Sequence, residues 1–179
     1  MKKTLLTLAV GCAALVSARD IPVQLERAAI GAAEIPGWTV NKSAKADDYG
    51  KGEIVVGSEA DEKAFHAIAP AKRTSAYYMI AHTPVKVGEY LEFSADIKGK
   101  GTVTFSYYMY DAKGRFLSGV RPDRKVFTLT DRWTEVKFKL KIISSPEGTV
   151  GKIRPCFTLS PGTDLLIEDL ELEIDDDLF

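Results

Sequence analysis

Residues 85–114 constrain the fold more than any other part of this chain, because they contain two runs of alternating apolar and polar side chains. The apolar members are Leu91, Phe93, Ala95 and Ile97 in the first run and Val103, Phe105, Tyr107 and Met109 in the second. A period of two places one set of side chains in a core and the other toward water. The segment therefore predicts two adjacent strands with a tight joint at residues 99–101 and a turn at residues 111–114.

Strand-like segments separated by Gly, Pro and Asp turns continue on both sides of this region. The predicted strands cover residues 38–41, 53–56, 64–68, 76–81, 90–98, 102–110, 125–130, 135–143, 152–159 and 165–174. Many short strands with frequent turns indicate an all-β sandwich or barrel. Residues 23–33 are the one candidate helix: alanines favour it, whereas Gly31 and the short length oppose it, so an edge strand is the alternative.

The first 18 residues have the pattern of a secretory signal peptide. Lys2 and Lys3 precede a largely apolar run that is too short to span a bilayer, and residues 16–18 form a small-residue cleavage site. We therefore expect a signal peptide at residues 1–18, a single β-sandwich domain at residues 19–179, and a secreted or periplasmic protein. A rival interpretation is a lipid anchor on Cys12, since residues 9–12 are a poor version of the bacterial lipoprotein box.

Net charge limits the classes of binding partner, and cysteine content limits the possible disulfides. Removal of the two lysines of the signal lowers the formal net charge from −1 to −3, and a weakly acidic chain has no bulk attraction for nucleic acid or anionic lipid. We expect no nucleic-acid partner and no membrane span. Without Cys12, Cys156 can form no intramolecular disulfide, so we expect a buried structural thiol.

Several short motifs follow one another in a fixed order between Ile35 and Glu173. They are Pro-Gly-Trp at 36–38, Val-Gly-Glu-Tyr at 87–90 with Phe-Ser-Ala-Asp-Ile-Lys-Gly at 93–99, Tyr-Asp-x-x-Gly at 110–114, Leu-Thr-x-x-Trp at 129–133, and the strand pair 153–159 and 166–172. Together they resemble secreted carbohydrate-binding modules with a galactose-binding-domain-like jelly roll. The resemblance implies a two-sheet jelly-roll β-sandwich and, by analogy from the fold, a carbohydrate partner.

The candidate ligand site lies on the polar face of the second alternating run. A sugar ring packs its C–H groups on an aromatic face, and its hydroxyls need a rim of hydrogen-bonding groups. The chain has one Asn and one Gln, so charged groups and aromatics would form most of that rim. The predicted ligand-binding residues are Tyr108 and Tyr110 in one strand, Arg154 and Thr158 on the matching face of residues 152–159, and Arg115 and Arg121 in the loop after the hairpin. Alternatively, the two tyrosines simply pack against a neighbouring loop.

A metal site is implied by the resemblance alone. Glu168 and Asp169 match the acidic pair that helps some of these jelly rolls to hold a structural Ca²⁺, with partners from Glu26 or Glu34 near the N-terminus. Calcium needs six to eight oxygen ligands, and the chain has no contiguous calcium loop. Ligand binding itself requires no cofactor.

No catalytic motif stands out: the chain lacks a nucleophile elbow, a metalloprotease helix and a phosphate loop. Its only histidines, His66 and His82, fit structural roles better. We therefore predict carbohydrate binding without catalysis.

Two alternatives stay open. One is a surface protein that binds other proteins, or itself as a homo-oligomer, through an exposed strip at Tyr77, Tyr78 and Met79. The other is a small glycoside hydrolase or lyase, which needs only two carboxylates.

Overall fold

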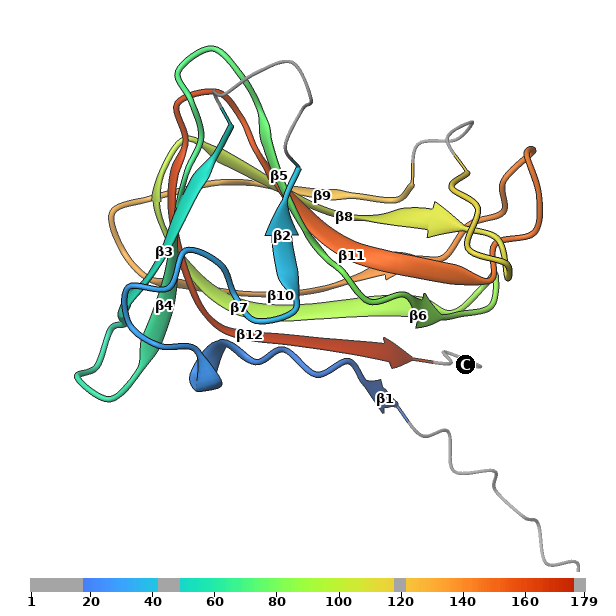
Figure 1. Ribbon diagram of the computed structural model, residues 1–179, viewed down its shortest axis with the longest axis horizontal. Coiled ribbons are helices and arrows are strands. Elements are labelled where there is room, and N and C mark those ends of the chain that lie inside the picture. The colour runs from blue at the N-terminus through green and yellow to red at the C-terminus, as the bar shows by residue number, and fades with distance from the viewer. Residues whose placement is uncertain (1–17, 42–48, 118–121, 176–179) are drawn as a thin grey trace, which may run out of the picture.

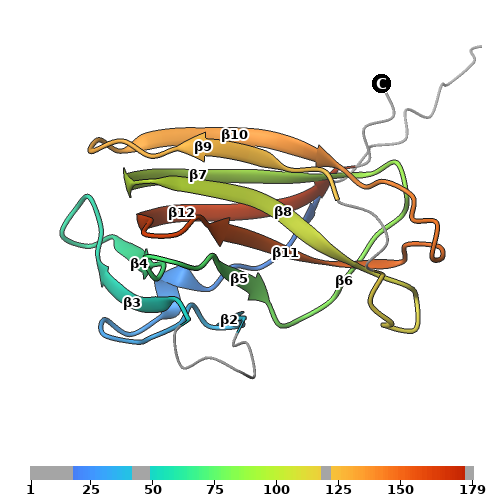
Figure 2. The ribbon, with the colours of Figure 1, turned by 90° about the horizontal axis from the view of Figure 1, so that it is seen from above.

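The computed structural model describes residues 18–41, 49–117 and 122–175, which form two antiparallel sheets stacked as a jelly-roll β-sandwich (Figure 1, Figure 2). In the first sheet the strand order is β10 (Thr134–Lys141), β7 (Tyr90–Lys100), β12 (Asp164–Asp175), β4 (Lys63–Ile68) and β3 (Lys51–Val56), with β1 (Arg19–Asp20) beside β12. In the second it is β2 (Trp38–Val40), β5 (Ser75–Met79), β11 (Lys152–Leu159), β8 (Thr102–Tyr110) and β9 (Lys125–Thr128), with β6 (Thr83–Pro84) beside β11. The predicted all-β sandwich is confirmed.

Each of the ten strands expected from the sequence overlaps a strand of the structure. The two strands that the sequence did not indicate, β1 and β6, are two residues long and lie along edges of longer strands. The helix considered at residues 23–33 is reduced to one 3-10 turn, η1 (Leu25–Arg27). Ala28 ends this turn in an extended conformation, as expected for a segment too short to support a helix.

The joint at residues 99–101 leads the chain from one sheet to the other. The two strands were predicted to be adjacent and are joined tightly, but β7 belongs to the first sheet and β8 to the second, so they do not pair and the chain crosses between layers here. Gly99 and Gly101 have φ of 142° and 101°, which favours glycine. A Cβ on Gly99 would also lie 2.0 Å from the carbonyl oxygen of Asp164, so no side chain fits at the crossing.

The two sheets enclose one continuous apolar core. Eight of the nine residues predicted at its centre are buried: Leu91, Phe93, Ile97, Phe105, Leu140, Phe157, Leu159 and Ile167. Phe138 is only partly buried, because β10 is the edge strand of the first sheet. Its ring nevertheless stacks on Phe93, with the ring centroids 5.3 Å apart.

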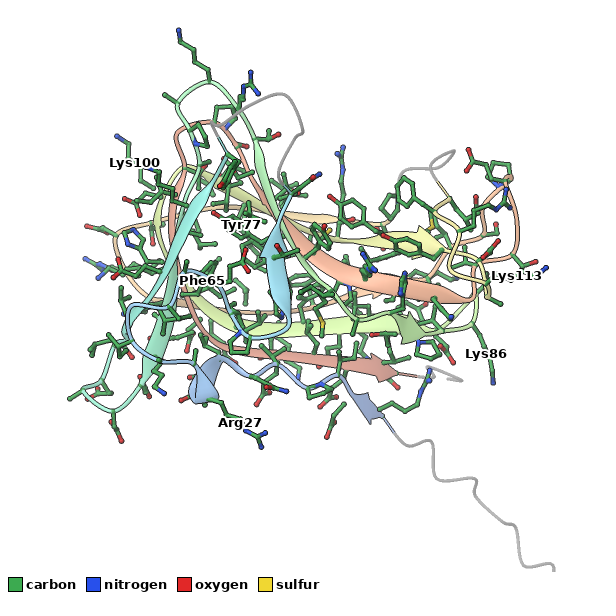
Figure 3. All side chains as sticks on the ribbon, viewed as in Figure 1. Arg27, Phe65, Tyr77, Lys86, Lys100 and Lys113 are labelled. Carbon is green, nitrogen blue, oxygen red and sulfur yellow. The ribbon has the colours of Figure 1, made fainter. Side chains whose placement is uncertain are left out.

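The exposed strip expected at Tyr77, Tyr78 and Met79 is not present. Tyr77 and Met79 are 2% and 5% exposed and belong to the core, and only Tyr78 faces outward. Figure 3 shows Tyr77 and Phe65 in the interior, where their rings make an edge-to-face contact at 5.4 Å. The Tyr77 hydroxyl donates a hydrogen bond to the Lys51 carbonyl, which satisfies the polar end of this buried ring.

Among the described residues, no helix has both the length and the apolar character needed to cross a membrane.

Replacement of Phe93 by alanine tests this account of the core. The side chain is fully buried and its ring contacts Phe105 of the opposite sheet at 5.3 Å, so Phe93→Ala should lower the free energy of unfolding by roughly 3–5 kcal/mol. Urea denaturation followed by intrinsic fluorescence measures this change. Val126→Ala, at a 53% exposed position, is the control and should stay within about 0.5 kcal/mol of the parent. Equal effects of the two variants would contradict the assignment of Phe93 to the core.

Candidate functional site

The candidate site is a groove on the outer face of the second sheet, where β5, β11 and β8 lie side by side (Figure 1). We call it the aromatic groove. It has a volume of about 210 Å³ and is lined by Asn41, Tyr78, Tyr108, Tyr110, Phe116 and Arg154. Tyr108 and Phe116 also form part of the wall of a larger cavity of about 460 Å³, the threonine cavity, whose lining includes Thr74, Thr104, Ser106, Arg124, Cys156 and Thr158.

Strand register brings the groove residues onto one face. Arg154 in β11 lies opposite Tyr108 in β8, and Cys156 lies opposite Tyr78 in β5. Tyr107 is fully buried, and successive side chains of a strand point to opposite faces. The ring of Tyr108 therefore points outward because its neighbour in the chain is part of the core.

The loop after β8 adds a fourth aromatic ring to the groove. A β-bridge between Phe116 and Tyr110 turns the chain back along the sheet, and the Phe116 side chain stays 50% exposed. The centroid of its ring lies 5.5 Å from that of Tyr110 and 6.0 Å from that of Tyr108, and Tyr108 contacts Tyr78 edge-to-face at 5.5 Å. The four rings thus form one connected aromatic surface that is open to solvent at Phe116.

Arg154 is the charged member of this surface. Its guanidinium carbon lies 5.1 Å from the ring centroid of Tyr110 and 5.9 Å from that of Tyr78, within the range of cation–π attraction. Its Nε atom is buried and has no hydrogen-bond partner. An unsatisfied buried donor lowers the stability of the fold by about 1–3 kcal/mol, so the position of this arginine between the rings is destabilising in that respect.

Burial controls ionisation on this face. It raises the pKa of the Tyr108 hydroxyl to about 12, so the hydroxyl stays protonated and available as a donor near neutral pH. Burial also raises the pKa of the Cys156 thiol to about 12. Cys156 is therefore an un-ionised structural thiol, which confirms the expectation that it is buried.

His82 borders the groove through Tyr110. The two rings are nearly perpendicular, with centroids 4.4 Å apart. Burial lowers the pKa of His82, and the positive charges of Arg154 and Lys152 lower it further. The imidazole is therefore neutral at pH 7, and protonation would add a cation beside two others.

The structure brings three of the predicted ligand-binding residues into contact in the aromatic groove: Tyr108, Tyr110 and Arg154. Thr158 lines the adjoining threonine cavity. Arg121 lies outside the described residues.

Arg115 does not line either hollow. It belongs to the turn after β8, where Lys113 is labelled in Figure 3. Its Nε lies 3.2 Å from a carboxylate oxygen of Asp111, and an Nη donates a hydrogen bond to the Glu147 carbonyl at 3.1 Å. These contacts fasten the turn to the neighbouring loop, so the expectation that Arg115 forms part of a ligand rim is not supported by its position.

Four residues that line or border the aromatic groove were not predicted from the sequence: Asn41, Tyr78, His82 and Phe116. Tyr78 lies in a run of apolar residues with no alternation, so its face could not be read. Phe116 comes two positions after the recognisable Tyr-Asp-x-x-Gly turn at 110–114, and no local pattern places it in the groove. His82 and Asn41 reach the groove through pairing between segments far apart in the sequence.

The predicted metal residues lie at a β-bulge in β12, where Asp169 has a positive φ of 50°. Glu168 is 2% exposed, and one of its carboxylate oxygens accepts a hydrogen bond from the Ser58 amide at 2.8 Å. In the part of the chain that the structure describes, no three His, Cys, Asp or Glu side chains gather so as to hold a metal ion. The arrangement does not provide a side-chain ligand set for calcium, and calcium binding stays a prediction.

No protein-family model and no curated protein matches this sequence. Solved structures do match the fold. The chain aligns with the CBM22-1 xylan-binding domain of Paenibacillus barcinonensis Xyn10C at a TM-score of 0.56 and 9% identity, over 90% of this chain and 97% of that one. It aligns with a family 11 carbohydrate-binding module of Clostridium thermocellum at a TM-score of 0.54 and 12% identity, over 89% and 95%.

A third match of similar extent is an enzyme. The Stig cyclase Fisc of Fischerella sp. TAU aligns at a TM-score of 0.56 and 11% identity, over 88% of this chain and 98% of that one. Some other matches are parts of much larger chains, and this protein spans only 19% of the enzymatically active domain of bacteriophage CBA120 tailspike protein 4. At such identities the likeness establishes the fold alone: this chain has the jelly-roll fold of family 22 and family 11 carbohydrate-binding modules.

The lowered pKa of His82 predicts a pH dependence of stability. Unfolded His82 recovers its ordinary pKa of 6.5, so the unfolded chain takes up this proton first as the pH falls. The free energy of unfolding should therefore decrease as the pH drops below about 6.5 and level off only once folded His82 is also protonated. His82→Gln should flatten this part of the profile, measured by urea denaturation between about pH 5 and pH 8. Parallel profiles for the two proteins would contradict the account.

Proposed function

We propose that this protein binds carbohydrate at the aromatic groove without cleaving it. The observation that carries the proposal is the convergence of Tyr78, Tyr108, Tyr110 and Phe116 on one half-open hollow of a sheet face. Soluble proteins seldom leave connected aromatic surface open to solvent unless something binds there. The full-length likeness to two carbohydrate-binding modules supports a binding role.

The groove has the two kinds of contact that a sugar needs. The exposed face of Phe116 and the tyrosine rings offer apolar surface to the C–H groups of a pyranose. Arg154 and Asn41 in the groove, and Thr158 and Ser106 in the adjoining cavity, offer hydrogen-bonding groups to hydroxyls. The combined hollow extends along the sheet from Tyr110 to Thr158, so we propose that it holds more than one sugar unit. Binding requires no cofactor in this proposal.

Removal of single rings tests the site. Tyr108→Ala, Tyr110→Ala and Phe116→Ala should each weaken polysaccharide binding by at least about tenfold, or about 1.4 kcal/mol, because each removes apolar surface that stacks on the sugar. The screen is affinity electrophoresis in gels that contain xylan, mixed-linkage β-glucan, pectin or alginate, and titration calorimetry then measures the affinity for polymers that retard the protein.

The control is Ile30→Ala, since Ile30 is an apolar side chain that is 56% exposed and lies outside the lining of both hollows. Thermal unfolding of each variant shows that the fold is retained. Retention of all three ring variants equal to that of Ile30→Ala would reject the groove as the binding site.

We also propose export of the protein through its N-terminal signal. Cleavage after Ala18 would give a mature chain that begins at Arg19, which lies in β1 at the edge of the first sheet. Intact mass of material from the native host should match residues 19–179. A mature N-terminus at Cys12 with an attached lipid would instead establish an anchored protein.

A further inference from the structure

We propose that the aromatic groove takes an acidic glycan, with a carboxylate of a uronic acid unit bound by Arg154 while the sugar ring stacks on the aromatic surface. This inference rests on the proposed carbohydrate binding and specifies its ligand class. Three observations carry it: the sign of the charges that line the two hollows, the charges that border them, and the way in which Arg154 is held.

The lining is cationic although the chain as a whole is slightly acidic. Arg154 in the groove and Arg124 in the threonine cavity are the charged side chains of the lining, and among the described residues neither hollow has an Asp or a Glu in its wall. The whole chain has 25 acidic and 24 basic residues. A lining whose charged residues are all basic therefore differs from the nearly equal numbers in the chain as a whole. A basic lining of this kind attracts negatively charged ligands.

The residues that border the groove reinforce this sign. Lys152 lies two positions before Arg154 on the same face of β11 and is opposite Tyr110. Both cations lower the pKa of His82, which reports their positive field at that edge of the groove. Asp111, in the turn that follows Tyr110, is already engaged: it accepts hydrogen bonds from the Lys113 and Arg115 amides and pairs with the Arg115 guanidinium.

Arg154 is oriented for an incoming carboxylate. The rings of Tyr110 and Tyr78 hold its guanidinium, and its buried Nε has no partner. A carboxylate would therefore meet the guanidinium end-on, through the two Nη groups, in a bidentate charge-assisted pair. Among the described residues no Asp or Glu forms an ion pair with Arg154, so none of them would compete with a bound carboxylate for its guanidinium. The same rings that hold the cation would stack against the sugar that carries the carboxylate.

Esterification of the ligand gives the sharpest test. Polygalacturonate and its fully methyl-esterified form share one sugar backbone and differ in charge, and alginate with its propylene-glycol ester makes a second pair. Calorimetry with the full chain should show at least about tenfold tighter binding of one acid form over its ester. Chondroitin sulfate and dextran sulfate show whether sulfate can replace the carboxylate.

Variants at Arg154 then assign the preference. Arg154→Lys keeps the charge but loses the bidentate geometry, and Arg154→Gln loses both, so the preference for the acid form should shrink in the first and disappear in the second. Affinity for the acid form should therefore fall by a larger factor than affinity for its ester in both variants. The control is Arg27→Gln, at an exposed arginine of η1 that points away from the sandwich (Figure 3).

The outcomes separate the two proposals. Equal affinity for acids and esters, or binding of xylan and mixed-linkage β-glucan alone, would overturn the acidic-glycan inference and leave carbohydrate binding intact. Binding that tracks sulfate density and falls equally in Arg27→Gln would also overturn it, because it would reflect unspecific charge attraction. No retention on any polysaccharide would reject the proposed function itself. Should Arg154→Gln unfold, the comparison of acids with esters on the parent chain still decides the inference.

Discussion

Contact between aromatic side chains of the two sheets is the constraint on which the rest of the structure depends. Phe93 of β7 meets Phe105 of β8 across the sandwich with ring centroids 5.3 Å apart, and Phe157 of β11 lies 6.1 Å from Phe105. Because side chains alternate along a strand, burial of Phe105 and Phe157 sends Tyr108 and Arg154 to the outer face. A shift of one residue in strand register would exchange the core-facing and outward-facing side chains. The packing of the core therefore also determines which side chains line the groove.

Tyr107 strengthens this link between core and groove. It is fully buried, yet its hydroxyl donates a hydrogen bond to the Lys141 carbonyl at 2.6 Å and accepts one from the Ile143 amide at 3.3 Å. Both partners belong to the end of β10 and the chain after it, so the contact ties the second sheet to the first. A satisfied buried hydroxyl of this kind specifies one packing arrangement. Tyr108, the next residue, is thereby held in position by its buried neighbour.

The sequence predicted what depends on alternation and missed what depends on long-range folding. Tyr108, Tyr110 and Arg154 could be placed on one face because β8 and β11 each have one buried side and therefore a period of two. In β5 the residues around Tyr78 are apolar on both faces, so no alternation of apolar and polar side chains indicated which way Tyr78 points. Phe116 reaches the groove only because its loop folds back onto Tyr110, a pairing that no local pattern encodes. The separation of β7 from β8 into two sheets was missed for the same reason.

The two outer faces of the sandwich use charge in opposite ways. On the first sheet Lys137 pairs with Glu92 at 2.7 Å, and Lys139 pairs with both Glu92 and Asp175, so these lysines meet acids within the face. Such exposed pairs contribute little stability but leave a solvated surface with little attraction for a charged ligand. On the second sheet the cation Arg154 rests on aromatic rings instead of on an acid. The proposed binding of an acidic glycan rests on this difference in how the described residues of the two faces hold charge.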